Sequence, residues 1–134
     1  MYTVNPDPAR LKQTFAAIPA DKPIVMLNLL KFRERAEYDD IAMNCSGREA
    51  YFERYSVEAY KFVKSVGGGL LWSGAACGSV IAPADESWDE VLLVRYPSIA
   101  AFQTMLYNPD YQKCAIHRTA ALENSRLIAT LENT

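Results

Sequence analysis

The sequence predicts an α+β domain in which helices cover one face of a four-stranded antiparallel sheet. Two observations predict this class. Apolar runs of strand length alternate with segments of helical periodicity, and proline, glycine and helix-capping residues separate them. The chain has 134 residues, of which 50% are hydrophobic and 22% charged, which suits a folded domain rather than a disordered segment. We therefore expect one domain over residues 1–134, with no linker inside it.

The first half of the chain predicts an extra helix before the first strand and a long helix after it. The expected elements are a helix over 8–18, a strand over 24–32, a surface loop over 33–45 and a helix from Ser46 to Val66. Asp7 caps the first helix, and Pro8 occupies its first position. The long helix begins with a capping box, in which Ser46 is followed three residues later by Glu49, and it ends at the glycine run 67–69.

The second half predicts a hairpin, two helices and a last strand. The expected elements are a strand over 70–82 kinked at Gly74 or Gly78, a turn over 83–87, a strand over 88–96, a helix after Ser98, a helix from Asn108 to about Leu122 and a strand over 126–131. Ser98 is a helix cap, and Asn108 followed by Pro109 is a cap with proline at the first helical position. After the leading helix, the order strand, helix, strand, strand, helix, strand is the ferredoxin-like arrangement.

The first strand is apolar on both faces. One face carries Val25, Leu27 and Leu29, and the other carries Met26 and Leu30 with Asn28 between them. An antiparallel sheet that leaves one face in water shows polar residues there, and helices can cover only one of these two faces. We therefore expect a homodimer in which two sheets pack against each other around a twofold axis. The alternative is that the extra N-terminal helix covers the second face.

Composition argues against several classes of protein. The balance of 14 basic and 16 acidic residues argues against nucleic-acid binding, and no run of about 18 apolar residues predicts a membrane span. The N-terminal segment has no signal-peptide pattern, so we expect a cytoplasmic protein with reduced thiols. Cys45, Cys77 and Cys114 form no C-x-x-C pair, and His117 is the single histidine, so no metal site is expected. We also expect no cofactor. The alternative is haem, which needs only one axial histidine.

Several segments of the chain resemble one known family. They are VMLNLLKF, SGREAYFERY, GGG with LLWSG, WDEVLLVRYPS, and NPDYQ with HRTAALENSRLI. Over about residues 24 to 131 the chain resembles the DUF1330 proteins of the dimeric α+β barrel superfamily, most specifically at Arg95–Ser98 and Asn108–Tyr111. The helix over 8–18 and the loop over 33–45 depart from that pattern. The resemblance implies a ferredoxin-like barrel dimer. The family has no assigned function, and the wider superfamily includes cofactor-independent monooxygenases, lactone isomerases and haem-binding members.

Three polar residues are candidates for catalysis. Asn28 is an amide among apolar neighbours, so it either orients a ligand oxygen or bonds to the backbone. Glu90 is a general base if it is buried, and otherwise a solvated carboxylate. His117 on the last helix titrates near neutral pH, and the alternative is a histidine at the protein surface.

Six residues are candidates for ligand binding. They are Arg95, Tyr51, Tyr60, Trp72, Tyr111 and Arg118. Arg95 suits a ligand carboxylate, and the alternative is an ion pair with Asp89, with Glu90 or with a second chain. The aromatic side chains on the long helix and at Trp72 suit the wall of an apolar pocket, whereas packing between helix and sheet is the better interpretation for Tyr55.

Two classes of function follow from these candidates. The first is a cofactor-independent monooxygenase or isomerase that acts on a hydrophobic or aromatic molecule in the barrel cavity. The second is a homodimer without catalytic activity, which either binds a small ligand or has a barrel filled by side chains. A cavity that reaches Asn28 and a titrating residue favours the enzyme.

Overall fold

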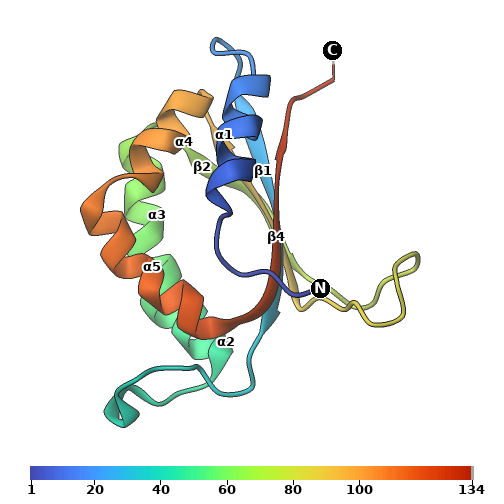
Figure 1. Cartoon of the computed structure of the whole chain (residues 1–134), viewed down its shortest axis with the longest axis vertical. Coiled ribbons are helices and arrows are strands. Elements are labelled where there is room, and N and C mark those ends of the chain that lie inside the picture. Colours follow the sequence, from blue (N-terminus) through green and yellow to red (C-terminus); the bar gives the residue numbers. More distant parts are fainter. Residues whose placement is uncertain (134) are drawn as a thin grey trace.

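A computed structural model describes residues 1–133 of the chain (Figure 1). The elements in chain order are helix α1 (Pro8–Ala17), strand β1 (Ile24–Phe32), the 3₁₀ helix η1 (Ile41–Met43), helix α2 (Gly47–Glu49), the π-helical segment η2 (Ala50–Tyr55), helix α3 (Ser56–Ser65), strand β2 (Gly69–Ala75), strand β3 (Glu90–Tyr96), helix α4 (Ile99–Leu106), helix α5 (Pro109–Ala121) and strand β4 (Leu122–Thr130).

The strands form one four-stranded sheet in the order β2-β3-β1-β4, with every neighbouring pair antiparallel. The helices lie on one side of this sheet, as Figure 1 shows. This topology confirms the ferredoxin-like arrangement that the order of elements predicts. It places the two halves of the chain side by side, because the central strands β1 and β3 come from different halves.

The predicted helix starts are confirmed. The side chain of Asp7 accepts a hydrogen bond from the backbone of Ala9, and Ser98 and Asn108 cap α4 and α5 in the same way. Ser46 and Glu49 form both hydrogen bonds of the capping box at the start of α2. These short-range bonds satisfy backbone N–H groups that would otherwise have no partner in the first helical turn.

The long helix over 47–65 has an irregular middle. Between α2 and α3, the segment η2 is π-helical, and the backbone N–H of Ser56 bonds to the carbonyl of Tyr51. A π-helical turn holds one more residue than an α-helical turn, so it changes which side chains face the sheet. Here Ala50, Tyr51 and Tyr55 are buried within it. The helix ends at Gly67, whose φ of 84° suits a residue without a Cβ.

Two predicted strand boundaries are wrong. The strand expected over 70–82 ends at Ala75, because β3 begins only at Glu90 and offers no partner beyond that point. Residues 76–89 instead form a loop in which Val80 is 99% and Ile81 95% exposed. The last strand begins at Leu122 rather than at 126, because the chain passes from α5 into β4 without a loop.

The two faces of the sheet have different environments. On the covered face, under the helices, Ile24, Met26 and Leu30 are buried in the core. On the open face, Leu27 pairs with Leu93 and with Ile128, which is 47% exposed, and Trp72 beside Leu93 is 54% exposed. Helix α1 packs on the covered side, where Phe15 meets Phe102 on α4 edge to face. The extra helix therefore leaves the open face uncovered.

Within residues 1–133, no helix is long and apolar enough to cross a membrane. The same residues contain no group of three histidine, cysteine, aspartate or glutamate side chains that could hold a metal ion.

Candidate ligand-binding cavity

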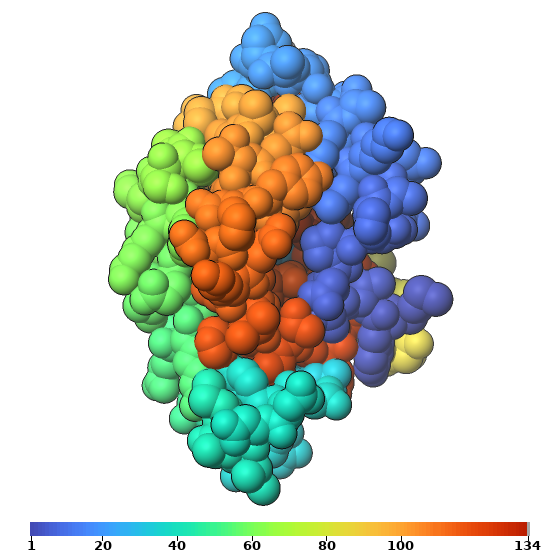
Figure 2. All heavy atoms as spheres, turned by 60° about the vertical axis from the view of Figure 1, so that its left-hand side comes forward, coloured from blue at the N-terminus to red at the C-terminus, as the bar shows by residue number. Residues whose placement is uncertain are grey.

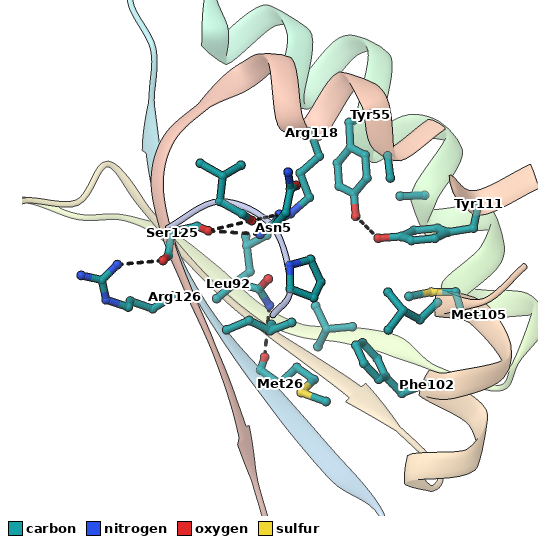
Figure 3. A pocket seen from close by; sticks show the side chains of 18 of the residues that line it. Asn5, Met26, Tyr55, Leu92, Phe102, Met105, Tyr111, Arg118, Ser125 and Arg126 are labelled. Carbon is teal, nitrogen blue, oxygen red and sulfur yellow. Dashed lines mark hydrogen bonds between the residues drawn. The ribbon is translucent and has the colours of Figure 1, made fainter. Parts of the chain in front are cut away.

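A cavity of about 1350 Å³ lies between the covered face of the sheet and the helices. Its walls come from the N-terminal segment, α1, η2, α3, α4 and α5, and its floor from the sheet (Figure 3). Figure 2 shows the surface hollowed between the blue N-terminal segment and the orange α4 and α5. The sequence led us to expect a cavity between two subunits. In the structure it is formed within one chain, because the helices do not pack closely onto the middle of the sheet.

The floor of the cavity is mostly apolar. Met26 on β1 and Leu92 and Val94 on β3 face it, together with Ala129 on β4. Phe102 and Met105 of α4 close the end near α1 (Figure 3). A pocket with this lining favours a ligand with a hydrophobic or aromatic body.

A pair of tyrosine hydroxyls lies on the helical wall. Tyr55 from η2 and Tyr111 from α5 are hydrogen-bonded through their hydroxyl oxygens at 2.7 Å. One of the two O–H groups donates to the other. The second O–H has no acceptor within residues 1–133 and can donate to an oxygen of a ligand. Figure 3 shows both rings beside the cavity.

The neighbouring tyrosines share this buried environment. Burial raises the pKa of Tyr51 to about 12, and burial also raises the pKa values of Tyr55 and Tyr111. The hydroxyls therefore stay protonated at neutral pH and serve as hydrogen-bond donors rather than as bases. The positive charge of Arg118 acts in the opposite direction on all three pKa values, which shows that the guanidinium lies near this wall.

Arg118 joins the N-terminal segment to β4 at the polar end of the cavity. Its guanidinium donates to the backbone oxygen of Val4 at 2.6 Å and to the hydroxyl of Ser125 at 3.5 Å. Ser125 and Thr3 exchange further hydrogen bonds along the chain, with Ser125 N–H at 2.6 Å from the Thr3 carbonyl oxygen. The N-terminal segment therefore runs beside β4 and forms part of the cavity wall.

Two of the three predicted catalytic residues line the cavity. The amide nitrogen of Asn28 donates to the carbonyl of Met26 at 3.3 Å, and its amide oxygen accepts no hydrogen bond within residues 1–133. Glu90 is buried, and its Oε1 lies 3.3 Å from a guanidinium nitrogen of Arg48. Its second oxygen, Oε2, accepts no hydrogen bond within the same residues. Each side chain therefore keeps a polar atom for a ligand.

The structure places His117 elsewhere. Its Nδ1 lies 2.7 Å from the hydroxyl of Tyr38 in the loop over 33–45, and it does not line the cavity. Burial, followed by the nearby charge of Arg54, lowers the pKa of His117. The ring is therefore neutral at pH 7 and accepts or donates a hydrogen bond according to its tautomer. This position links α5 to the loop.

Of the six ligand-binding candidates, four line the cavity and two do not. Tyr51, Tyr60, Tyr111 and Arg118 line the cavity, and Tyr60 does so from an exposed position on α3. Arg95 and Trp72 lie on the open face, away from the cavity, because each is paired across the strands with a residue of that face. Within residues 1–133, Arg95 forms no ion pair with Asp89 or Glu90: Asp89 lies 3.7 Å from Lys31, and Glu90 binds Arg48. An ion pair of Arg95 with a second chain stays a prediction.

Sequence reasoning missed two parts of the cavity. It assigned Tyr55 to packing, whereas the extra residue per turn in η2 brings this side chain beside Tyr111. It also left out the N-terminal residues Thr3 to Asn5 and Ser125, whose contacts span more than 120 positions in the sequence. The cap at Asp7 was the available signal that an ordered segment lies near the N-terminus.

The fold and the cavity define a ferredoxin-like α+β protein with an internal cavity, and solved structures agree on the fold. A candidate antibiotic biosynthesis monooxygenase from Caulobacter crescentus matches with a TM-score of 0.55 and 12% identity, over 91% of this chain and 99% of that one. A dimeric protein of unknown function with a ferredoxin-like fold from Bacteroides fragilis matches with a TM-score of 0.50 and 11% identity, over 85% and 100% of the two chains. These matches concern the fold alone.

One solved structure is much more similar. The RPA0582 protein of unknown function from Rhodopseudomonas palustris shares 36% identity with this chain and has a TM-score of 0.90, with 100% of this chain and 99% of that chain covered. The chain belongs to the family of this protein. No family model and no curated protein matches it.

Proposed function

We propose that the protein is an enzyme of the cofactor-independent monooxygenase or isomerase type, which acts on a hydrophobic or aromatic small molecule inside each chain. The observation that carries this proposal is the cavity of about 1350 Å³, whose apolar walls reach both Asn28 and the titrating side chain of Glu90. The candidate monooxygenase from C. crescentus, with the same fold, supports this choice of chemistry. We further propose that the family is the DUF1330 family, on the motifs at Arg95–Ser98 and Asn108–Tyr111.

We assign roles to the polar residues from their atoms that have no hydrogen-bond partner within residues 1–133. Oε2 of Glu90 takes a proton from the substrate, while Oε1 is held by Arg48. Asn28 and the tyrosine pair Tyr55–Tyr111 hold the substrate oxygen on which negative charge develops after that step. An isomerase returns the proton at another atom, whereas a monooxygenase lets the substrate anion react with dioxygen. His117, Arg95 and Trp72 have no role in this step.

The second candidate function is a dimer that binds a small ligand without catalysis. The ion pair between Glu90 and Arg48 favours it, because a buried carboxylate that already has a guanidinium partner also suits a purely structural role. The two candidates share the cavity and differ in one property, the removal of a proton from the bound molecule.

We also propose a homodimer in which the open faces of two sheets pack together. The open face carries exposed Trp72 and Ile128, and the loop over 76–89 extends on the same side with Val80 and Ile81 exposed (Figure 1). An apolar surface of this extent is typical of an interface. The dimeric B. fragilis protein with this fold supports the assembly. A cytoplasmic location stays a prediction.

Deuterium exchange separates the enzyme from the binding protein. The molecule that copurifies with the protein is released by denaturation, identified by its mass, and incubated with fresh protein in D₂O. An enzyme that removes a proton introduces deuterium or converts the molecule, and Glu90→Gln abolishes this change while the molecule still binds. Binding without exchange in the wild-type protein contradicts the catalytic proposal and supports the second candidate. His117→Gln is the control, because His117 lies outside the cavity.

A further inference from the structure

Arg118 is a partly buried arginine of the cavity wall that, like the exposed Arg10, has no carboxylate partner within residues 1–133, whereas two neighbouring arginines do. Arg48 is paired with Glu90 and Arg126 with Glu86, whereas Arg118 forms no ion pair with a carboxylate within residues 1–133. Its hydrogen-bond partners are a backbone carbonyl and a serine hydroxyl, both neutral. A partly buried cation with neutral partners is favourable only when water or an anion completes its surroundings.

The guanidinium of Arg118 also has donors to spare. An arginine carries five N–H groups in a planar fork, and Arg118 uses two hydrogen bonds to hold Val4 and Ser125. The remaining part of the fork is suited to the two oxygens of a carboxylate, which guanidinium groups bind through parallel hydrogen bonds. Arg118 is among the residues that line the cavity, so these donors are within reach of a ligand there.

The side chains around Arg118 and at the far end of the cavity indicate the polarity of the rest of the ligand. Figure 3 shows Arg118 and the Tyr55–Tyr111 pair at one end of the cavity, and Met26, Leu92 and Phe102 toward the other. The other charged groups along the walls are the ion-paired Glu90 and Arg126, with exposed Asp7 and Arg10 at the N-terminal side. One end of the cavity therefore suits an anionic group and the other end an apolar body.

We propose that the ligand of this cavity is an aromatic or hydrophobic carboxylate, bound with its carboxylate on Arg118 and its apolar body over Met26 and Leu92. This inference rests on the proposed use of the cavity for a small molecule, and it adds the chemical class of that molecule. It does not depend on whether Glu90 removes a proton.

Two probes that differ in one group test the proposal. 2-Naphthoate and 2-naphthalenemethanol have the same ring system, and only the first carries a carboxylate. Calorimetry measures both with the wild-type protein and with Arg118→Met, Arg118→Lys and Arg35→Met. We expect the wild type to bind the carboxylate about ten- to a hundredfold more tightly than the alcohol, since hydrogen bonds to charged groups contribute about 1.5–3 kcal/mol. Arg118→Met removes this preference and leaves the affinity for the alcohol within about twofold.

The remaining variants sharpen the test. Arg118→Lys keeps the charge without the fork, so we expect an intermediate preference. Arg35→Met removes an exposed cation in the loop over 33–45, outside the cavity, and keeps the full preference. A carboxylate preference that survives in Arg118→Met overturns the proposal. Loss of both probes in Arg118→Met also overturns it, because Arg118 then only holds the N-terminal segment in place. If neither probe binds the wild-type protein, the proposed function fails together with this inference.

Discussion

The two faces of the central sheet contain similar residues and meet different surroundings. Leu92 and Leu93 are neighbours on β3, yet Leu92 faces the cavity and Leu93 lies on the open face opposite Leu27. On the covered side the helices supply buried tyrosines, whereas the open side carries apolar side chains such as Leu27, Leu93 and Ile128 together with Arg95 and Arg126. This difference is the basis of our proposal that one face serves a small ligand and the other serves a second copy of the chain.

The largest effect is expected from a charge on the open face. Leu93→Asp places a carboxylate in the proposed interface of both copies, and desolvating it costs several kcal/mol per copy. We expect the variant to be monomeric at micromolar concentration, as measured by native mass spectrometry. Val57→Asp is the control, because Val57 on α3 is 53% exposed and far from this face in the fold. A dimer that survives Leu93→Asp shows that the open face is not the interface.

Filling the cavity gives the next largest effect. Leu92→Trp adds an indole to the floor beneath the helices, and it leaves the open face unchanged. We expect the affinity for 2-naphthalenemethanol to fall by at least about tenfold, because the probe loses its space, while the oligomeric state stays that of the wild type. Val57→Trp, outside the cavity, keeps the affinity. Unchanged binding in Leu92→Trp places the probe elsewhere.

The buried tyrosines predict a loss of stability at alkaline pH. The pKa of Tyr51 is about 12 in the folded protein and about 10 in the unfolded chain, so the unfolded chain releases its proton first. The contribution of Tyr51 to the free energy of unfolding is fully present below pH 10. It falls as the pH rises toward 12, by about 3 kcal/mol for this one group. Denaturant unfolding at pH 8 to 11.5 measures it. Tyr51→Phe is expected to reduce the pH dependence, and an equal slope in the variant contradicts this assignment.

The tyrosine pair contributes a smaller amount. Tyr55→Phe leaves the hydroxyl of Tyr111 without its partner, and we expect a loss of about 1–2 kcal/mol in the free energy of unfolding. The double variant Tyr55→Phe with Tyr111→Phe removes both polar groups and is expected to recover part of that loss. If the double variant loses as much stability as the two single variants together, the hydroxyls are not coupled as the 2.7 Å distance indicates.

The smallest effect is expected at His117. His117→Ala breaks the hydrogen bond to Tyr38 but touches no cavity residue, so the affinity for 2-naphthoate should change by less than about twofold. A larger change would restore His117 as a binding residue through movement of the loop over 33–45. The measurement is calorimetry at pH 8, where the histidine is neutral because its pKa is lowered.

The sequence predicted the fold from local signals. Caps at Asp7, Ser46, Ser98 and Asn108 determine where helices begin, and each acts within three residues of the chain, so each is visible in one sequence. The end of β2 at Ala75 was missed because it depends on where a distant partner strand begins. A strand boundary is set by pairing across the sheet, which a local pattern does not record.

The site was predicted only in part, for a related reason. Alternation along β1 predicted that Asn28 shares a face of the strand with Met26, and the structure confirms this. The structure brings His117 to Tyr38 rather than to the cavity, which spacing alone did not predict, because a helical position determines a face but not which partner meets that face. The hydroxyl pair of Tyr55 depended on the π-helical segment. Arg118 was predicted as a ligand-binding residue, but its partners depended on an N-terminal segment that pairs with β4 more than 120 residues later. Contacts over such separations are set by packing rather than by spacing.

The most direct test of the two-face account is native mass spectrometry of the wild-type protein titrated with 2-naphthalenemethanol. The account predicts a dimer that takes up one probe molecule per chain, because each chain forms its own cavity on the side away from the interface. It also predicts that Leu93→Asp is a monomer that still takes up one molecule. A monomeric wild-type protein, or a single probe molecule shared by two chains, would contradict the assignment of separate roles to the two faces.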